Sequence, residues 1–236
     1  MGDLWQQKRI KVQANCVSEY GGVFVDDTPK LQVQMMLQQH RRDLKRIQSF
    51  ERKAQYKQKI LPLYVPWVDE VLKQQSGVQD DVLMFVMLWR IDASDYVGAL
   101  DIAEYALKHG LKMPGQQTRS TGCAVAEEMA EAASRHYALK NPLLLCLLER
   151  TFALTLQEDM PDKVRAKLYK YLGFSQRDNQ FSTLALISLK RALMLDKNVG
   201  VKTDIKQLEK INPPSIATRQ GDTGNHLVDC PSTARL

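Results

Sequence analysis

The fold is decided by residues 82–111, which read VLMFVMLWRIDASDYVGALDIAEYALKHGL. The first eight residues are apolar, and a polar turn at 92–96 separates them from the pairs Ala99-Leu100 and Ala106-Leu107. Small alanines where two helices cross let the backbones approach closely, which is the packing of tetratricopeptide-like hairpins. The stretch therefore predicts two packed helices joined by a short turn.

A second copy of this pattern occupies residues 164–195. A helix ending near Gly173 precedes a polar turn at 176–180, and Ala185-Leu186 and Ala192-Leu193 follow. Between the copies, an Ala-rich segment (124–139) and a Leu-rich segment capped by Asn141-Pro142 and running to residue 156 predict another hairpin. From Ala99 to Ala185 the copies lie 86 residues apart, so the sequence predicts a small helical array and not a regular repeat protein.

On the N-terminal side, residues 30–60 predict one helix of about thirty residues, because they lack Gly and Pro and follow the helix start Thr28-Pro29. Pro62 and Pro66 end that helix and fix a bend, after which residues 67–74 predict a short helix. A weak coiled-coil seam follows four- and three-residue steps, and Glu51 interrupts it. The seam consists of Val33, Leu37, His40, Leu44, Ile47 and Ala54.

The net charge of +6 is confined to this end of the chain. Residues 1–60 hold 12 Lys and Arg against 6 Asp and Glu, whereas residues 61–236 hold 21 of each. A surplus this local predicts an anionic partner, and Lys and Arg beside phosphates release counterions. We therefore expect a surface for double-stranded DNA, with a solvated helix face as the alternative. Its expected members are Arg41, Arg42, Lys45, Arg46, Arg52, Lys53 and Lys57.

The sequence thus predicts an all-α protein in four parts. Residues 1–29 form a flexible arm, and residues 30–78 form a basic, partly coiled-coil helical region for DNA binding and oligomer contacts. Residues 79–211 form the helical-hairpin array. After Ile211 the composition shifts to Pro, Gly, Ser and Thr, so residues 212–236 are expected to be a disordered tail.

Composition excludes several classes of protein. The longest uncharged apolar run, residues 82–89, is too short to span a bilayer. Four cysteines are scattered without paired spacing (Cys16, Cys123, Cys146 and Cys230), so neither a disulfide framework nor a zinc site is expected. We expect a reduced, intracellular protein that uses no cofactor.

Two segments resemble catalytic motifs. Residues 110–117 have the two glycines of a phosphate loop but lack its Lys and Ser/Thr, so we interpret them as a helix C-cap and turn. Asp80 and Asp81 could belong to a two-metal nuclease site. The simpler interpretation is that these carboxylates begin the helix at Val82, where they face unpaired N–H groups. The histidines are too far apart to predict a metal cluster.

These residues together resemble the small terminase subunit family of tailed phages with cohesive DNA ends. The resemblance covers roughly residues 30–211. It rests on Ile60-Leu61-Pro62, Pro66-Trp67-Val68, Gln79-Asp80-Asp81, the run Val86 to Arg90, Gly98-Ala99-Leu100, Tyr105-Ala106-Leu107, Gly110-Leu111, Met113-Pro114, Asp159 to Asp162 and Val164 to Leu168.

The resemblance implies a role in viral genome packaging in the cytoplasm of the bacterial host. Such a subunit binds the packaging site, assembles as an oligomeric ring, and presents DNA to a large subunit that carries the ATPase. Relatives often end in a Lys/Arg-rich tail. Residues 212–236 have only Arg219 and Arg235 against Asp222 and Asp229, so the 30–60 region is expected to carry more of the DNA contact.

Whether this subunit also cuts DNA stays open at this point. The family has been labelled the terminase endonuclease subunit, but the residues supply no evident catalytic site, and terminase nucleases generally lie in the large subunit. Two alternatives remain. One is a metal-dependent endonuclease that cuts the packaging site with Asp80 or Asp81, and the other is a helical scaffold that binds no DNA.

Overall fold

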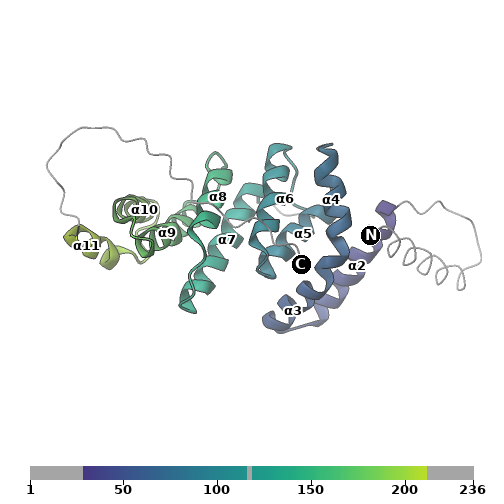
Figure 1. Cartoon of the computed structure of the whole chain (residues 1–236), viewed down its shortest axis with the longest axis horizontal. Coiled ribbons are helices and arrows are strands. Elements are labelled where there is room, and N and C mark those ends of the chain that lie inside the picture. The colour runs from purple at the N-terminus through teal and green to yellow at the C-terminus, as the bar shows by residue number, and fades with distance from the viewer. Residues whose placement is uncertain (1–28, 116–118, 212–236) are drawn as a thin grey trace, which may run out of the picture. The chain divides into compact units, whose positions relative to one another are not determined.

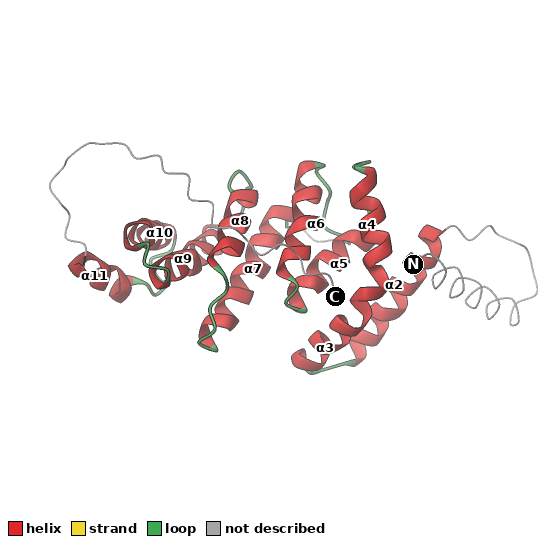
Figure 2. Cartoon of the chain, in the orientation of Figure 1, coloured by secondary structure: helices red, strands yellow, loops and turns green. Residues whose placement is uncertain are grey.

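The computed structural model describes residues 29–115 and 119–211, and these residues form helices without any β-strand (Figure 2). The predicted all-α class is therefore confirmed. Residues 1–28 of the expected arm and the expected tail lie outside the described residues. The elements are α2 (Pro29–Arg46), α3 (Phe50–Ile60), the 3-10 helix η1 (Leu61–Tyr64), α4 (Val65–Gln74), α5 (Asp81–Asp92), α6 (Tyr96–Lys108), α7 (Thr121–Ala138), α8 (Leu145–Thr155), α9 (Asp162–Asp178), α10 (Ser182–Leu195) and α11 (Lys202–Ile211).

The chain divides into two units, residues 1–36 and residues 37–236. In the first unit the structure describes residues 29–36, the beginning of α2, where Pro29 is the first helical residue as expected. Thr28, its predicted cap, lies outside the described residues. The second unit holds the end of α2 and all the other elements.

Helix α5 is the most enclosed helix of the N-terminal half of the second unit. Its side chains are apolar on all sides, and a helix of this kind is stable only when other elements surround it. It packs against α3, η1, α6 and α7. The buried residues of α5 are Val82, Leu83, Met84, Val86, Met87, Trp89 and Ile91.

Packed helix pairs occupy both predicted stretches, as α5–α6 and α9–α10 (Figure 1). The four alanines at the predicted crossings, Ala99, Ala106, Ala185 and Ala192, are at most 1% exposed. The middle pair, α7 and α8, is also present. Its second helix begins at Leu145, after Asn141-Pro142 and two further residues.

The prediction of one helix over residues 30–60 is wrong. Helix α2 ends at Arg46 and α3 begins at Phe50, so three residues break the expected helix. The two prolines act as expected, because Pro62 lies in the first turn of η1 and Pro66 in the first turn of α4. Because of this break, the seven predicted DNA-contact residues lie on two helices, α2 and α3, and not on one.

Candidate nucleic-acid interface

Residues 47–49 form the turn between α2 and α3. Ser49 has extended backbone angles, and its hydroxyl accepts a hydrogen bond from the Arg52 N–H at 3.3 Å, as an N-cap does. Lys45 and Arg46 lie in the last turn of α2, where positive charge is favoured by the helix dipole. Ser49 therefore caps the start of α3, and the turn contains neither Gly nor Pro.

A cluster of aromatic rings holds the end of α2 against the helical body. His40 Nδ1 and Tyr64 Oη are 2.8 Å apart, and the Tyr64 ring meets the Trp89 ring edge-on at 5.9 Å. Tyr64 is fully buried, and so are the seam residues Leu37 and Leu44. Two of the six residues of the predicted coiled-coil seam are therefore buried within this chain, and the other four are half-buried.

The His40 contact predicts an acid-sensitive stability. Burial lowers the pKa of His40 below 6.5, and the smaller effect of Asp43 opposes this shift. The unfolded chain therefore binds a proton at a higher pH than the folded chain, and folding loses stability as pH falls below 6.5. Urea unfolding from about pH 7.5 to about pH 5.5 measures this, with a limiting slope of about 1.4 kcal/mol per pH unit. In His40→Asn the dependence should be flatter, and equal slopes in both proteins would contradict the prediction.

Two of the seven predicted DNA-contact residues have structural roles. The Arg41 guanidinium lies over the Phe85 ring, 4.2 Å from its centroid. Lys57 forms an ion pair with Asp92, and its side chain is only 13% exposed. We therefore assign these two side chains to the packing of α2 and α3 against α5.

The other five predicted residues keep their charges accessible near the turn. Arg46 lies 3.9 Å from Asp43, which makes a loose ion pair, and the other four form no ion pair with any described carboxylate. Lys53 Nζ is 5.6 Å from the ring centroid of Phe50, which is 88% exposed. We call this set the turn cluster: Arg42, Lys45, Arg46, Arg52 and Lys53.

Helical spacing aligns members of the turn cluster. Arg42, Lys45 and Arg46 are three and four residues apart, so they lie on one face of α2. On α3, Arg52, Gln55 and Lys59 are exposed at steps of three and four residues. Phe50 was not predicted as part of a site, although its position among basic residues was a visible signal. The structure thus shows a basic face on each side of a three-residue turn.

The two residues of the acidic pair have different surroundings. Asp80 is buried and is the N-cap of α5, since its carboxylate accepts hydrogen bonds from the Leu83 N–H at 3.0 Å and from Trp67 Nε1 at 2.9 Å. Asp81 is exposed, and Gln79 Nε2 donates to it at 3.2 Å. The N-cap interpretation is confirmed. The described residues contain no group of three His, Cys, Asp or Glu side chains that could hold a metal ion.

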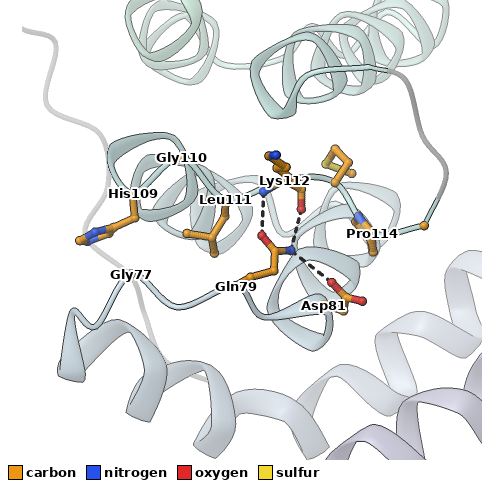
Figure 3. Close-up of a pocket in the computed structure, with 10 residues that line it drawn as sticks. Gly77, Gln79, Asp81, His109, Gly110, Leu111, Lys112 and Pro114 are labelled. Carbon is orange, nitrogen blue, oxygen red and sulfur yellow. Dashed lines mark hydrogen bonds between the residues drawn. The ribbon is translucent and has the colours of Figure 1, made fainter.

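The glycine-containing loop after α6 is a helix end. Gly110 has a positive φ of 66°, and the Leu111 N–H donates to the Ala106 carbonyl at 2.8 Å. The Gln79 amide then accepts from the Lys112 N–H and donates to the Lys112 carbonyl, both at 2.9 Å (Figure 3). These bonds use backbone groups that a phosphate loop would offer to a ligand. The open pocket beside this loop, of about 530 Å³, therefore shows no phosphate cradle in its described residues.

The described helices also bear on the membrane question. None of those within residues 29–115 and 119–211 has the length and apolar character needed to cross a bilayer.

Comparisons with known proteins identify the family of this chain. The family model of the phage small terminase subunit matches residues 34–163. The terminase, endonuclease subunit of Escherichia phage P2 is 46% identical over 194 residues, which is 80% of this chain and 78% of that protein. The probable terminase, endonuclease subunit of Haemophilus phage HP1 (strain HP1c1) is 28% identical over 127 residues, 50% of this chain and 44% of that protein. No solved structure matches. The chain therefore belongs to the phage small terminase subunit family.

Proposed function

We propose that this subunit binds viral DNA through the turn cluster and directs genome packaging together with an ATPase large subunit. The observation that carries the proposal is the turn cluster itself. In a chain whose net positive charge lies in its first sixty residues, five cations stay accessible around one turn. Family membership supplies the biological setting, because terminases act on phage DNA.

The arrangement also supports a mode of DNA binding. A helix, a three-residue turn and a second basic helix is the connectivity of helix-turn-helix proteins, in which the second helix enters the major groove. On α3, Arg52 and Gln55 are exposed, and Arg and Gln side chains pair with guanine and adenine edges. We propose that α3 reads bases while Arg42, Lys45 and Arg46 contact phosphates.

The proposal also assigns a role to each of the larger parts of the chain. The array at 79–211 offers surfaces for the large subunit and for neighbouring copies in a homo-oligomeric ring, and residues 30–78 form the DNA-binding region. The complex acts in the cytoplasm of the infected bacterial host.

DNA cleavage is a second candidate function, because both relatives are named terminase endonuclease subunits. Among the described residues, Asp80 is occupied as a helix cap, and no carboxylate cluster accompanies Asp81. We therefore propose that cleavage requires the assembled terminase. Cleavage of cohesive-end DNA by the purified subunit with Mg²⁺ alone would contradict this assignment.

Neutralising the three α2 cations should weaken DNA binding at least about tenfold. Each lost phosphate contact lowers the salt slope by about 0.9, so Arg42→Gln/Lys45→Gln/Arg46→Gln should flatten it by about 2.7 if all three contact phosphates. Fluorescence anisotropy measures both quantities, using a labelled duplex that carries the cohesive-end site, between about 50 and about 200 mM salt.

The matched control removes the same charge from the other end of the described chain. Lys202→Gln/Lys206→Gln/Lys210→Gln changes three exposed lysines of α11 and should leave affinity and slope close to wild type. Circular dichroism verifies that both variants fold. Equal losses in the two variants would show that only net charge matters, and no loss in either would favour the scaffold hypothesis.

A further inference from the structure

Helix α10 has an apolar surface on the side that faces away from its packing partners. Ala185, Ser188, Leu189 and Ala192 are buried, which accounts for one face of the helix. A second row, Phe181, Leu184, Ile187 and Met194, is exposed, with Ile187 at 61% and Met194 at 73%. We call this second set the outer row. A helix that is apolar on two faces is normally covered on both, and within residues 29–115 and 119–211 no element covers the outer row.

Positive charge borders the outer row. Arg191 is exposed within it, between Ile187 and Met194, and Lys197 follows the end of α10. Helix α11 packs on α10 (Figure 1), and its buried residues are Ile205 and Leu208. It adds three exposed lysines at four-residue steps, Lys202, Lys206 and Lys210.

The nearby carboxylates are already engaged. Glu209 pairs with Lys190 at 2.7 Å, and Asp204 pairs with Arg177 at 2.6 Å. Asp196 accepts a hydrogen bond from the Asn198 N–H at 2.8 Å. Asp196 keeps its negative charge, because its printed partner is a backbone N–H, but it is outnumbered by Arg191, Lys197 and the three α11 lysines, which form no ion pair with a described carboxylate.

We propose that the outer row and its cationic border dock an acidic amphipathic helix of a partner protein. Apolar side chains on such a helix would cover Ile187 and Met194, and its Asp and Glu residues would face Arg191 and the α11 lysines. Because the chain belongs to a terminase family, we assign this helix to the large subunit. The assignment of this helix to the large subunit rests on the proposed function.

Two other occupants fit the surface less well. DNA would satisfy the lysines, but its phosphates would leave Leu184, Ile187 and Met194 in water. A second copy of the chain would cover the apolar row, but a two-fold contact would bring the same cationic border against itself. An acidic amphipathic helix would both cover the apolar outer row and pair with its cationic border.

The test measures binding of the full chain to the purified large subunit of the same terminase. Ile187→Asp/Met194→Asp should weaken binding at least about tenfold, as expected for apolar residues at the centre of an interface. Lys206→Glu/Lys210→Glu should weaken it several-fold, and more strongly at low salt. Matched controls place the same changes elsewhere: Leu139→Asp at the end of α7, and Lys140→Glu/Lys163→Glu.

Each outcome decides the proposal. Unchanged affinity in the outer-row variant, or no binding by the wild type, would overturn it. A change in the sedimentation of the isolated chain with Ile187→Asp/Met194→Asp would identify a second copy as the occupant. Loss of DNA binding in Lys206→Glu/Lys210→Glu would identify DNA. A wild-type chain that binds the large subunit but no DNA would contradict the proposed function and leave the docking proposal standing.

Discussion

Replacing Asp80 with alanine should lower the free energy of unfolding by about 2–4 kcal/mol. The substitution removes the N-cap of α5, which contributes up to about 2 kcal/mol. It also leaves Trp67 Nε1, on a half-buried side chain, without its acceptor, at a cost toward the lower end of the about 1–3 kcal/mol of a fully buried donor. Because α5 packs against α3, η1, α6 and α7, the effect should appear in global unfolding by urea, followed by circular dichroism.

Two controls separate these contributions. Asp81→Ala changes the exposed neighbour and should shift stability by no more than about 0.5 kcal/mol. Asp80→Asn keeps one acceptor oxygen and replaces the other with an NH2 donor. That NH2 group would face either the Leu83 N–H or Trp67 Nε1, which are themselves donors, so one of the two hydrogen bonds is lost. Adding Trp67→Phe removes one donor, and the cost of Asp80→Asn should then be smaller. An equal cost in both backgrounds would contradict the importance of the indole bond.

The same residue shows what short-range sequence information can predict. Asp80 before an apolar run, Gly110 after one, and prolines at 62 and 66 each determine backbone geometry through atoms a few residues away. The helix starts and ends at these sites were therefore predictable from sequence. The alanine pairs also predicted which helices pack together, because small side chains at a crossing let two helix backbones approach closely.

The candidate site was less predictable, because distant residues decide it. Ser49 can cap a helix but also occurs within helices, so the break at 47–49 depends on contacts that hold α3 back on α2, such as the Tyr56–Asp43 hydrogen bond at 3.1 Å. Likewise, nothing near Arg41 or Lys57 in sequence indicates Phe85 or Asp92 as their partners. Charge counting identified the region, but tertiary contacts select which cations stay accessible.

Truncating Leu189 to alanine should lower the free energy of unfolding by about 2–5 kcal/mol, the range for large-to-small changes in a core. Leu189 is fully buried between α9 and α10, the pair that presents the outer row. It fills the space above Gly173, where an added Cβ would lie 2.7 Å from Leu189 Cδ2 and 3.3 Å from the Ala185 carbonyl oxygen. Urea unfolding measures the loss.

The contact with Gly173 makes this prediction specific. Gly173→Ala alone should be destabilising by about 1–3 kcal/mol, because overpacking against Leu189 exceeds the gain of about 1 kcal/mol in helix propensity. In the Leu189→Ala background the close contact is gone, so Gly173→Ala should become nearly neutral or stabilising. A double-mutant cycle should then give a coupling of about 1–3 kcal/mol. Additive effects would mean that Gly173 is not required for close approach, and that the α9–α10 pair tolerates a wider separation.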